Sequence, residues 1–174
     1  MIITPVDSKA DLFTVSDVIP QSILEEISQL DLNSIPWTKE QWQQEYNRKR
    51  LKPCSILQKV DDIIKSNLDK INEITLMNAE GCATGFWLDG PGFTMTSHID
   101  NSDVFASMQL FLLDCASCPG TKFTFTGADR HVFDHQKNTG YIMINGLDQH
   151  HEVAGSVPDN KLRLSSYTWF FPKL

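Results

Sequence analysis

From about residue 71 to residue 174, the chain is a succession of short apolar runs separated by residues that favour turns. The runs are rich in β-branched and aromatic residues, and Gly, Pro, Asp and Asn fill the intervals between them. We expect a strand at each of about eight runs, at residues 73–78, 85–88, 94–100, 104–113, 122–126, 141–145, 150–153 and 162–171. Strands at this spacing predict a sandwich or a jelly-roll barrel and disfavour βαβ units.

The first 70 residues have a helical pattern instead. Residues 20–30 start with Pro20 and carry apolar residues at helical spacing, and residues 55–68 carry a similar apolar stripe behind Ser55. Thr38-Lys39-Glu40-Gln41 has the form of a capping box and predicts a short helix. We therefore predict one α+β domain over residues 1–174, mainly β, with a helical brace over about residues 1–70 and a jelly-roll core over about residues 71–174.

Charge and hydropathy narrow the classes of function. The net charge of −7 disfavours a protein that coats nucleic acid nonspecifically. The basic run Arg48-Lys49-Arg50-Leu51-Lys52 is interpreted as a solvated face, although it keeps nucleic acid open as a partner. No segment reaches the roughly 18 apolar residues of a membrane span, and residues 1–12 lack the pattern of a secretory signal. We expect a cytoplasmic protein without a membrane partner.

The four cysteines raise the question of a metal site or a disulfide. Cys115 and Cys118 have C-x2-C spacing, but Cys54 and Cys82 stand alone and supply no second pair for zinc. We interpret all four as ordinary free thiols, with Cys115 and Cys118 in a turn between strands.

His98-Ile99-Asp100 is an H-x-D element. Because side chains alternate along a strand, His98 and Asp100 would share one face. Two imidazoles and one carboxylate form the facial triad of non-heme iron oxygenases, so a second histidine is required from a distant strand. Of the adjacent His150 and His151, only one can point inward, because neighbouring residues of a strand face opposite sides of the sheet.

The last predicted strand offers a site for an anion. Alternation places Arg163, Ser165, Tyr167 and Trp169 on one face. An arginine that faces a barrel interior needs an anion, and a guanidinium binds a carboxylate through two parallel hydrogen bonds. Ser165 can add a hydroxyl donor. The metal ligands and Arg163 together would suit a dicarboxylate that chelates iron at one end.

From Gly85 to its C-terminal end, the chain resembles the Fe(II)- and 2-oxoglutarate-dependent oxygenases, on the branch of the prolyl hydroxylases. The residues that carry the resemblance are Gly92-Phe93, the H-x-D element, Gly120 to Phe123, His151-Glu152-Val153, Arg163 and Trp169-Phe170-Phe171. The resemblance implies a double-stranded β-helix (a jelly roll of the cupin type), Fe(II) bound by His98, Asp100 and His151, and the far carboxylate of 2-oxoglutarate bound by Arg163.

The chain departs from this family at one position that matters for the cosubstrate. In the prolyl hydroxylases a tyrosine on the strand after H-x-D helps to hold 2-oxoglutarate, but here residues 108–113 contain none. Ser165 can take that role, and Gln109 is either a contact of the cosubstrate or an exposed strand residue.

Other polar and aromatic residues have less specific interpretations. His131 and His135 are expected to be solvated loop residues. Asn101 and Ser102 either touch substrate or close a turn, and Trp37, Trp42 and Tyr46 are better explained by core packing than by a substrate entrance.

The function we predict is a dioxygenase that uses Fe(II), 2-oxoglutarate and O2, with ascorbate as a further candidate cofactor. It would hydroxylate a C–H bond of a peptide, an amino acid or another small molecule and release succinate and CO2. Two alternatives stay open: a jelly-roll module that binds metal and 2-oxoglutarate without turnover, and a cupin-type metalloenzyme that does not use 2-oxoglutarate. The oligomeric state is not predicted.

Overall fold

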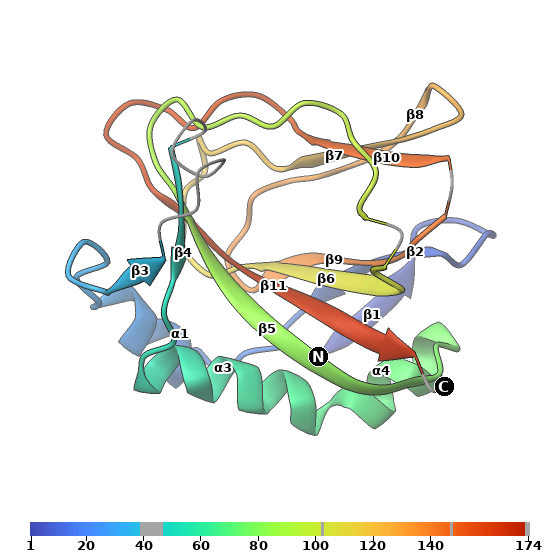
Figure 1. Ribbon diagram of the computed structural model, residues 1–174, viewed down its shortest axis with the longest axis horizontal. Helices are drawn as coiled ribbons and strands as arrows, with labels where there is room; N and C mark the ends of the chain where they lie inside the picture. The colour runs from blue at the N-terminus through green and yellow to red at the C-terminus, as the bar shows by residue number, and fades with distance from the viewer. Residues whose placement is uncertain (39–46, 102, 147, 173–174) are drawn as a thin grey trace.

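The computed structural model describes residues 1–38, 47–101, 103–146 and 148–172, and in these ranges two antiparallel sheets face each other (Figure 1). The larger sheet has, in spatial order, the strands β1 (Ile2–Pro5), β2 (Leu12–Ser16), β9 (Thr139–Ile144), β6 (Ala106–Phe111), β11 (Arg163–Pro172), β5 (Ala79–Asp89), β4 (Arg48–Leu51) and β3 (Trp37–Thr38). The smaller sheet has the order β10 (Gln149–Val153), β7 (Thr121–Phe125) and β8 (Ala128–Phe133).

The helices α1 (Gln21–Ser28), α3 (Ser55–Ser66) and α4 (Leu68–Thr75) cover the face of the larger sheet that points away from the smaller one (Figure 1). The apolar stripe predicted for α3 is buried there, with Leu57, Val60 and Ile64 fully inaccessible to solvent. The main hydrophobic core lies between these helices and the larger sheet. The prediction of a mainly β fold braced by helices is therefore confirmed.

The N-terminal part of the chain also contributes strands, although its sequence pattern predicts helices. β1 and β2 form a hairpin that extends the larger sheet through β9, and β4 pairs with β5 on the other side. Thr38 lies in β3, while the rest of the predicted capping box, residues 39–41, lies outside the described residues.

Two predicted strands are wrong. Residues 73–75 are the last turn of α4, because Ile71 and Thr75 are four residues apart and both bury against the core. Residues 94–100 form no regular strand, and their pairing with β10 is limited to one bridge, His98 to His151, flanked by the bond from the Val153 N–H to the Met95 carbonyl oxygen.

The turn between β6 and β7 also differs from expectation. Cys115 and Cys118 form a disulfide, so the prediction of free thiols is wrong for this pair, whereas Cys54 and Cys82 are free. The Cys118 N–H donates to the Cys115 carbonyl oxygen at 2.9 Å, and this turn brings the two Cα atoms to 5.2 Å, within disulfide range.

The register of β11 determines which side chains face the smaller sheet. Arg163 lies opposite Asp89 of β5, and Tyr167 lies between Gly85 of β5 and Gln109 of β6. Since alternate residues of a strand share a face, the polar residues Arg163, Ser165 and Tyr167 point between the sheets while Leu164 and Phe170 join the core under the helices.

None of the helices in the described ranges is long and apolar enough to cross a membrane.

Candidate metal centre

Three side chains that could ligate a metal converge between the sheets. One ligand atom each from His98, Asp100 and His151 lies within 4.8 Å of the other two, in the described part of the chain. The Nε2 atom of His151 is 3.6 Å from Oδ1 of Asp100, and the ring centroids of His98 and His151 are 4.2 Å apart. The backbones of His98 and His151 exchange two hydrogen bonds of 3.0 and 2.9 Å, which fix this approach.

The protonation state of His151 and the hydrogen bond of His98 both suit metal binding. His151 is buried and His150 is half-buried, and it is His151 that faces the cavity described below. Burial lowers the pKa of His151 to about 4, with Asp100 acting in the opposite direction. The imidazole is therefore neutral near pH 7, as a metal ligand must be. His98 can donate from Nδ1 to the carbonyl oxygen of Thr96 at 2.9 Å, which would leave Nε2 as its ligand atom.

Asp100 is oriented by two hydroxyl groups of the larger sheet. Its Oδ2 atom accepts a hydrogen bond from the Tyr167 hydroxyl and one of 3.5 Å from Ser107, while Oδ1 faces His151. Burial holds the pKa of Tyr167 well above its usual value, so the phenol stays protonated and donates. Two imidazole nitrogens and one carboxylate oxygen, supported in this way, fit the donor set of non-heme Fe(II).

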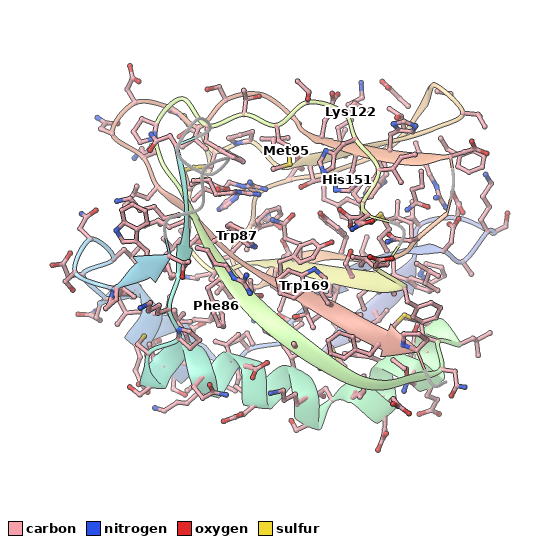
Figure 2. The ribbon with its side chains drawn as sticks, viewed as in Figure 1. Phe86, Trp87, Met95, Lys122, His151 and Trp169 are labelled. Atoms are coloured by element: carbon pink, nitrogen blue, oxygen red, sulfur yellow. A yellow bond between two sulfur atoms is a disulfide. The ribbon has the colours of Figure 1, made fainter. Side chains whose placement is uncertain are left out.

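The candidate ligands line a cavity of about 510 Å³ between the two sheets. Figure 2 shows Trp87 and Trp169 on the larger sheet, across from Met95 and His151, whereas Phe86, next to Trp87, points toward the helices. Trp87, Trp169, Met95 and His151 all line the cavity, and Arg163 does so as well. The cavity therefore contains both the possible metal ligands and a cation.

Arg163 is fully buried and only partly satisfied. Its Nη1 donates to Oδ2 of Asp89 at 2.8 Å. Its Nε and Nη2 atoms have no hydrogen-bond partner among the described residues. A buried guanidinium with two unused N–H groups directed along one edge is suited to a carboxylate, which would accept two parallel hydrogen bonds.

A group of buried polar side chains lies beside Arg163. Gln109 donates from Nε2 to Oγ of Ser165 at 3.1 Å, and its Oε1 accepts hydrogen bonds from Tyr141 at 2.8 Å and from Thr121 at 3.4 Å. The exposed alternative for Gln109 is wrong, since only 6% of the residue is accessible. Because Gln109 donates to Ser165, the Ser165 hydroxyl hydrogen is left to point elsewhere, including toward an anion at Arg163.

Sequence motifs did not reveal every residue of this site, and the environments of two histidines were predicted wrongly. Tyr141, Asp89 and Arg48 were not identified, and Arg48 is not solvated as expected: its side chain is 10% exposed and paired with Asp89 at 2.6 Å. Of these three residues, only Tyr141 could have been found from the sequence, because it lies at the start of a predicted strand. His135 is buried, because it hydrogen-bonds the Leu113 carbonyl oxygen and packs on Phe111.

The structure describes some of the other polar and aromatic residues considered in the sequence. Asn101 is exposed and lines the cavity, and Ser102 lies outside the described residues. Trp37 packs against the main core, as expected, while Trp42 and Tyr46 lie outside the described residues. His131, which was predicted to lie in a solvated loop, is instead half-buried on strand β8.

Comparisons with known proteins bear on the fold. No family model and no curated protein matches the chain. The structure is similar to a prolyl-4-hydroxylase from Pseudomonas putida, with a TM-score of 0.67 and 16% identity over 97% of each chain. It is also similar to a prolyl hydroxylase from Trichoplax adhaerens in complex with a peptide fragment of the hypoxia inducible factor oxygen degradation domain, with a TM-score of 0.71 and 14% identity over 93% of this chain and 84% of that one.

A 2OG-Fe(II) oxygenase family protein from Burkholderia pseudomallei is a third similar structure, with a TM-score of 0.66 and 13% identity over 94% of this chain and 85% of that one. At such identities the likeness concerns the fold. The predicted double-stranded β-helix is confirmed, and the resemblance stated from the motifs holds at the level of the fold.

Proposed function

We propose that this protein is an Fe(II)- and 2-oxoglutarate-dependent dioxygenase that hydroxylates a C–H bond of its substrate. One observation carries the proposal: the cavity is lined by His98, Asp100 and His151 and by Arg163, whose Nε and Nη2 atoms have no partner within the described part of the chain. A metal chelated by one end of a dicarboxylate and an arginine at the other end would use both features at once.

The residues have distinct roles in this proposal. His98, Asp100 and His151 hold the iron, while Tyr167 and Ser107 keep the Asp100 carboxylate in its orientation. Arg163 and Ser165 bind the far carboxylate, with Gln109 orienting Ser165. Iron bound there would supply the activation of O2 and the oxidative decarboxylation of the 2-oxo acid to succinate and CO2.

The substrate we propose is a peptide, with a prolyl residue as the first candidate. The similar structure from Trichoplax adhaerens contains a bound peptide fragment, which supports this class. The indole rings of Trp87 and Trp169 in the cavity wall offer apolar surface for one side chain of such a peptide.

The test is succinate formation by protein loaded with Fe(II) without oxygen and then given 2-oxoglutarate and O2. We expect succinate from the wild-type protein, none from Asp100→Ala, and a much higher demand for 2-oxoglutarate in Arg163→Ala. His150→Ala is the matched control, because His150 neighbours His151 but does not line the cavity, and it should retain the wild-type rate.

Succinate from Asp100→Ala at the wild-type rate would contradict the proposal. Binding of 2-oxoglutarate without succinate, in the presence of a panel of prolyl peptides, would favour the non-catalytic module. Activity that does not depend on 2-oxoglutarate would favour a cupin-type enzyme.

A further inference from the structure

Three strands of the larger sheet bring two arginines to one buried aspartate. Asp89 is fully buried at the end of β5, and Arg48 of β4 and Arg163 of β11 lie directly opposite it on either side. Arg48 donates from Nε to Oδ1 at 2.6 Å and from Nη2 to Oδ2 at 3.1 Å, and Arg163 donates from Nη1 to Oδ2 at 2.8 Å. Both cations therefore share a single carboxylate.

The charges of this group do not cancel. Two guanidinium groups and one carboxylate leave one positive charge at a place where Asp89 and Arg163 are fully buried. Arg163 with Asp89 alone would be a neutral pair, which has little need of a further anion. The presence of Arg48 is what leaves the cavity wall at Arg163 cationic.

Arg48 is held where it can act on the cavity. Its guanidinium carbon lies 4.3 Å from the ring centroid of Phe93 and 5.0 Å from that of Trp87, and Arg48 lines the same cavity as Arg163. Its bidentate contact occupies both oxygens of Asp89, whereas Arg163 uses one N–H group and keeps Nε and Nη2 for a ligand.

We propose that Arg48 determines the preference of the site for a 2-oxo acid with a second, distal carboxylate. Arg48 offsets the negative charge of Asp89, so the Nε–Nη2 edge of Arg163 presents a net positive charge to the cavity. The inference rests on the proposed function, because it assumes that the 2-oxo acid chelates a metal held by His98, Asp100 and His151. Arg48 acts here as a positioning residue through Asp89 and Arg163, and the distal carboxylate of the acid supplies the missing negative charge.

Two ligands separate this role from a purely structural one. 2-Oxoglutarate and 2-oxobutyrate have the same chelating head, but 2-oxobutyrate has no distal carboxylate. Calorimetric titration of each acid into Mn(II)-loaded protein under nitrogen measures binding without turnover. In Arg48→Gln we expect 2-oxoglutarate to bind at least about tenfold more weakly and 2-oxobutyrate to change by less than about twofold.

The charge balance can be restored within the same protein. In the double variant Arg48→Gln/Asp89→Asn, the group again carries one net positive charge, that of Arg163, and the new amide oxygen can accept the hydrogen bond from Nη1. We expect it to bind 2-oxoglutarate at least about threefold more tightly than Arg48→Gln does. Arg48→Lys keeps the positive charge and should preserve the preference for the dicarboxylate. This variant replaces Arg48→Gln in the test if Arg48→Gln does not fold.

The outcomes distinguish this inference from the proposed function. Suppose that the wild-type protein binds 2-oxoglutarate, but Arg48→Gln weakens the binding of both acids equally or changes neither. The inference about Arg48 is then overturned while the proposed function stands. If Arg48→Lys is used instead, loss of the preference for 2-oxoglutarate overturns the inference in the same way. If the metal-loaded wild-type protein binds neither acid, the proposed function is overturned and the inference with it.

Discussion

Asp100 is the residue on which the candidate site depends most. One carboxylate oxygen faces His151, and the other accepts hydrogen bonds from Tyr167 and Ser107 of the larger sheet. The smaller sheet thus supplies His151, and hydroxyl groups of the larger sheet fix the orientation of the carboxylate. Partners that orient a metal ligand in this way usually contribute measurably to metal affinity.

Tyr167→Phe tests this at the level of one hydroxyl group. The ring would still fill its space, but Asp100 would lose a donor whose raised pKa keeps it protonated. We expect Fe(II) or Mn(II) to bind about 10- to 100-fold more weakly, as measured by anaerobic calorimetry. Unchanged metal affinity would show that the Tyr167 hydroxyl does not support the metal site. Tyr141→Phe is the matched control, because the Tyr141 hydroxyl contacts Gln109 and not Asp100.

The residues of the site differ in how far the sequence could predict them. His98, Asp100, His151 and Arg163 belong to motifs with fixed spacing, and the structure brings them to one cavity. Arg48 could not be predicted, because its partner Asp89 is 41 residues away and the basic run around it has the composition of a solvated face. The burial of His135 depends in the same way on a contact with Leu113, 22 residues earlier in the chain.

At the level of the elements, the close pairing of β9 with β6 supports the cavity wall. Gly140 of β9 lies opposite Leu110 of β6, and a Cβ atom at residue 140 would be 1.8 Å from the carbonyl oxygen of Gln109. A side chain there would push apart the two strands that present Tyr141 and Gln109 to the cavity. Glycine is thus required by the strand spacing at this position.

Gly140→Ala should therefore destabilise the protein. We expect a loss of about 1–3 kcal/mol in the free energy of unfolding, measured by urea denaturation, from overpacking between β9 and β6. Gly146→Ala is the control, since a Cβ atom at residue 146 would meet nothing within 4 Å, and it should change stability by less than about 0.5 kcal/mol. Equal effects of the two substitutions would contradict the account of β9.

The elements were predicted unevenly. The runs that became β6, β7, β9, β10 and β11 combine β-branched and aromatic residues with clear turns, and their strands were predicted within a few residues. β4 is a basic run, Arg48–Leu51, that forms a strand because β5 offers it an edge, which no local pattern reveals. Residues 94–100 look like a strand but pair with β10 at one bridge, because the chain bends to bring His98 and Asp100 to His151.

At the level of the whole molecule, the helices pack on one face of the larger sheet and the smaller sheet lies opposite its other face (Figure 1). The cavity lies between the two sheets. His135 lies in the segment between β8 and β9, with 6% of its surface exposed and its ring 4.5 Å from that of Phe111. Burial lowers its pKa to about 4, and the nearby charge of Arg163 acts in the same direction. The folded protein therefore keeps His135 neutral at pH values where the unfolded chain would protonate it.

Stability should depend on pH in the window that this shift defines. Above about pH 6.5, His135 is neutral in both the folded and the unfolded state, so its titration does not lower the free energy of unfolding. As the pH falls toward 4, the unfolded state binds a proton that the folded state does not, and the free energy of unfolding decreases. We expect His135 to account for a loss on the order of 2 kcal/mol across this window in the metal-free protein.

His151 titrates in the same range, so the comparison must be between variants. Urea denaturation of the wild-type protein and of His135→Gln at pH 7 and at pH 4.5 isolates the contribution of His135. The loss of stability between the two pH values should be smaller in His135→Gln, and an equal loss in both proteins would be inconsistent with a buried neutral His135.

The organisation of the chain as a single domain stays a prediction, whereas the double-stranded β-helix is confirmed by its similarity to the prolyl hydroxylase structures.

The central claim is that one cavity holds a metal and a 2-oxo dicarboxylate at the same time. It is tested most directly by calorimetric titration of 2-oxoglutarate under nitrogen, with and without Mn(II). Bound metal should raise the affinity at least about tenfold, through chelation, and Asp100→Ala should abolish that gain. An affinity that is the same with and without metal would mean that the acid does not bind at the metal, and would contradict the account.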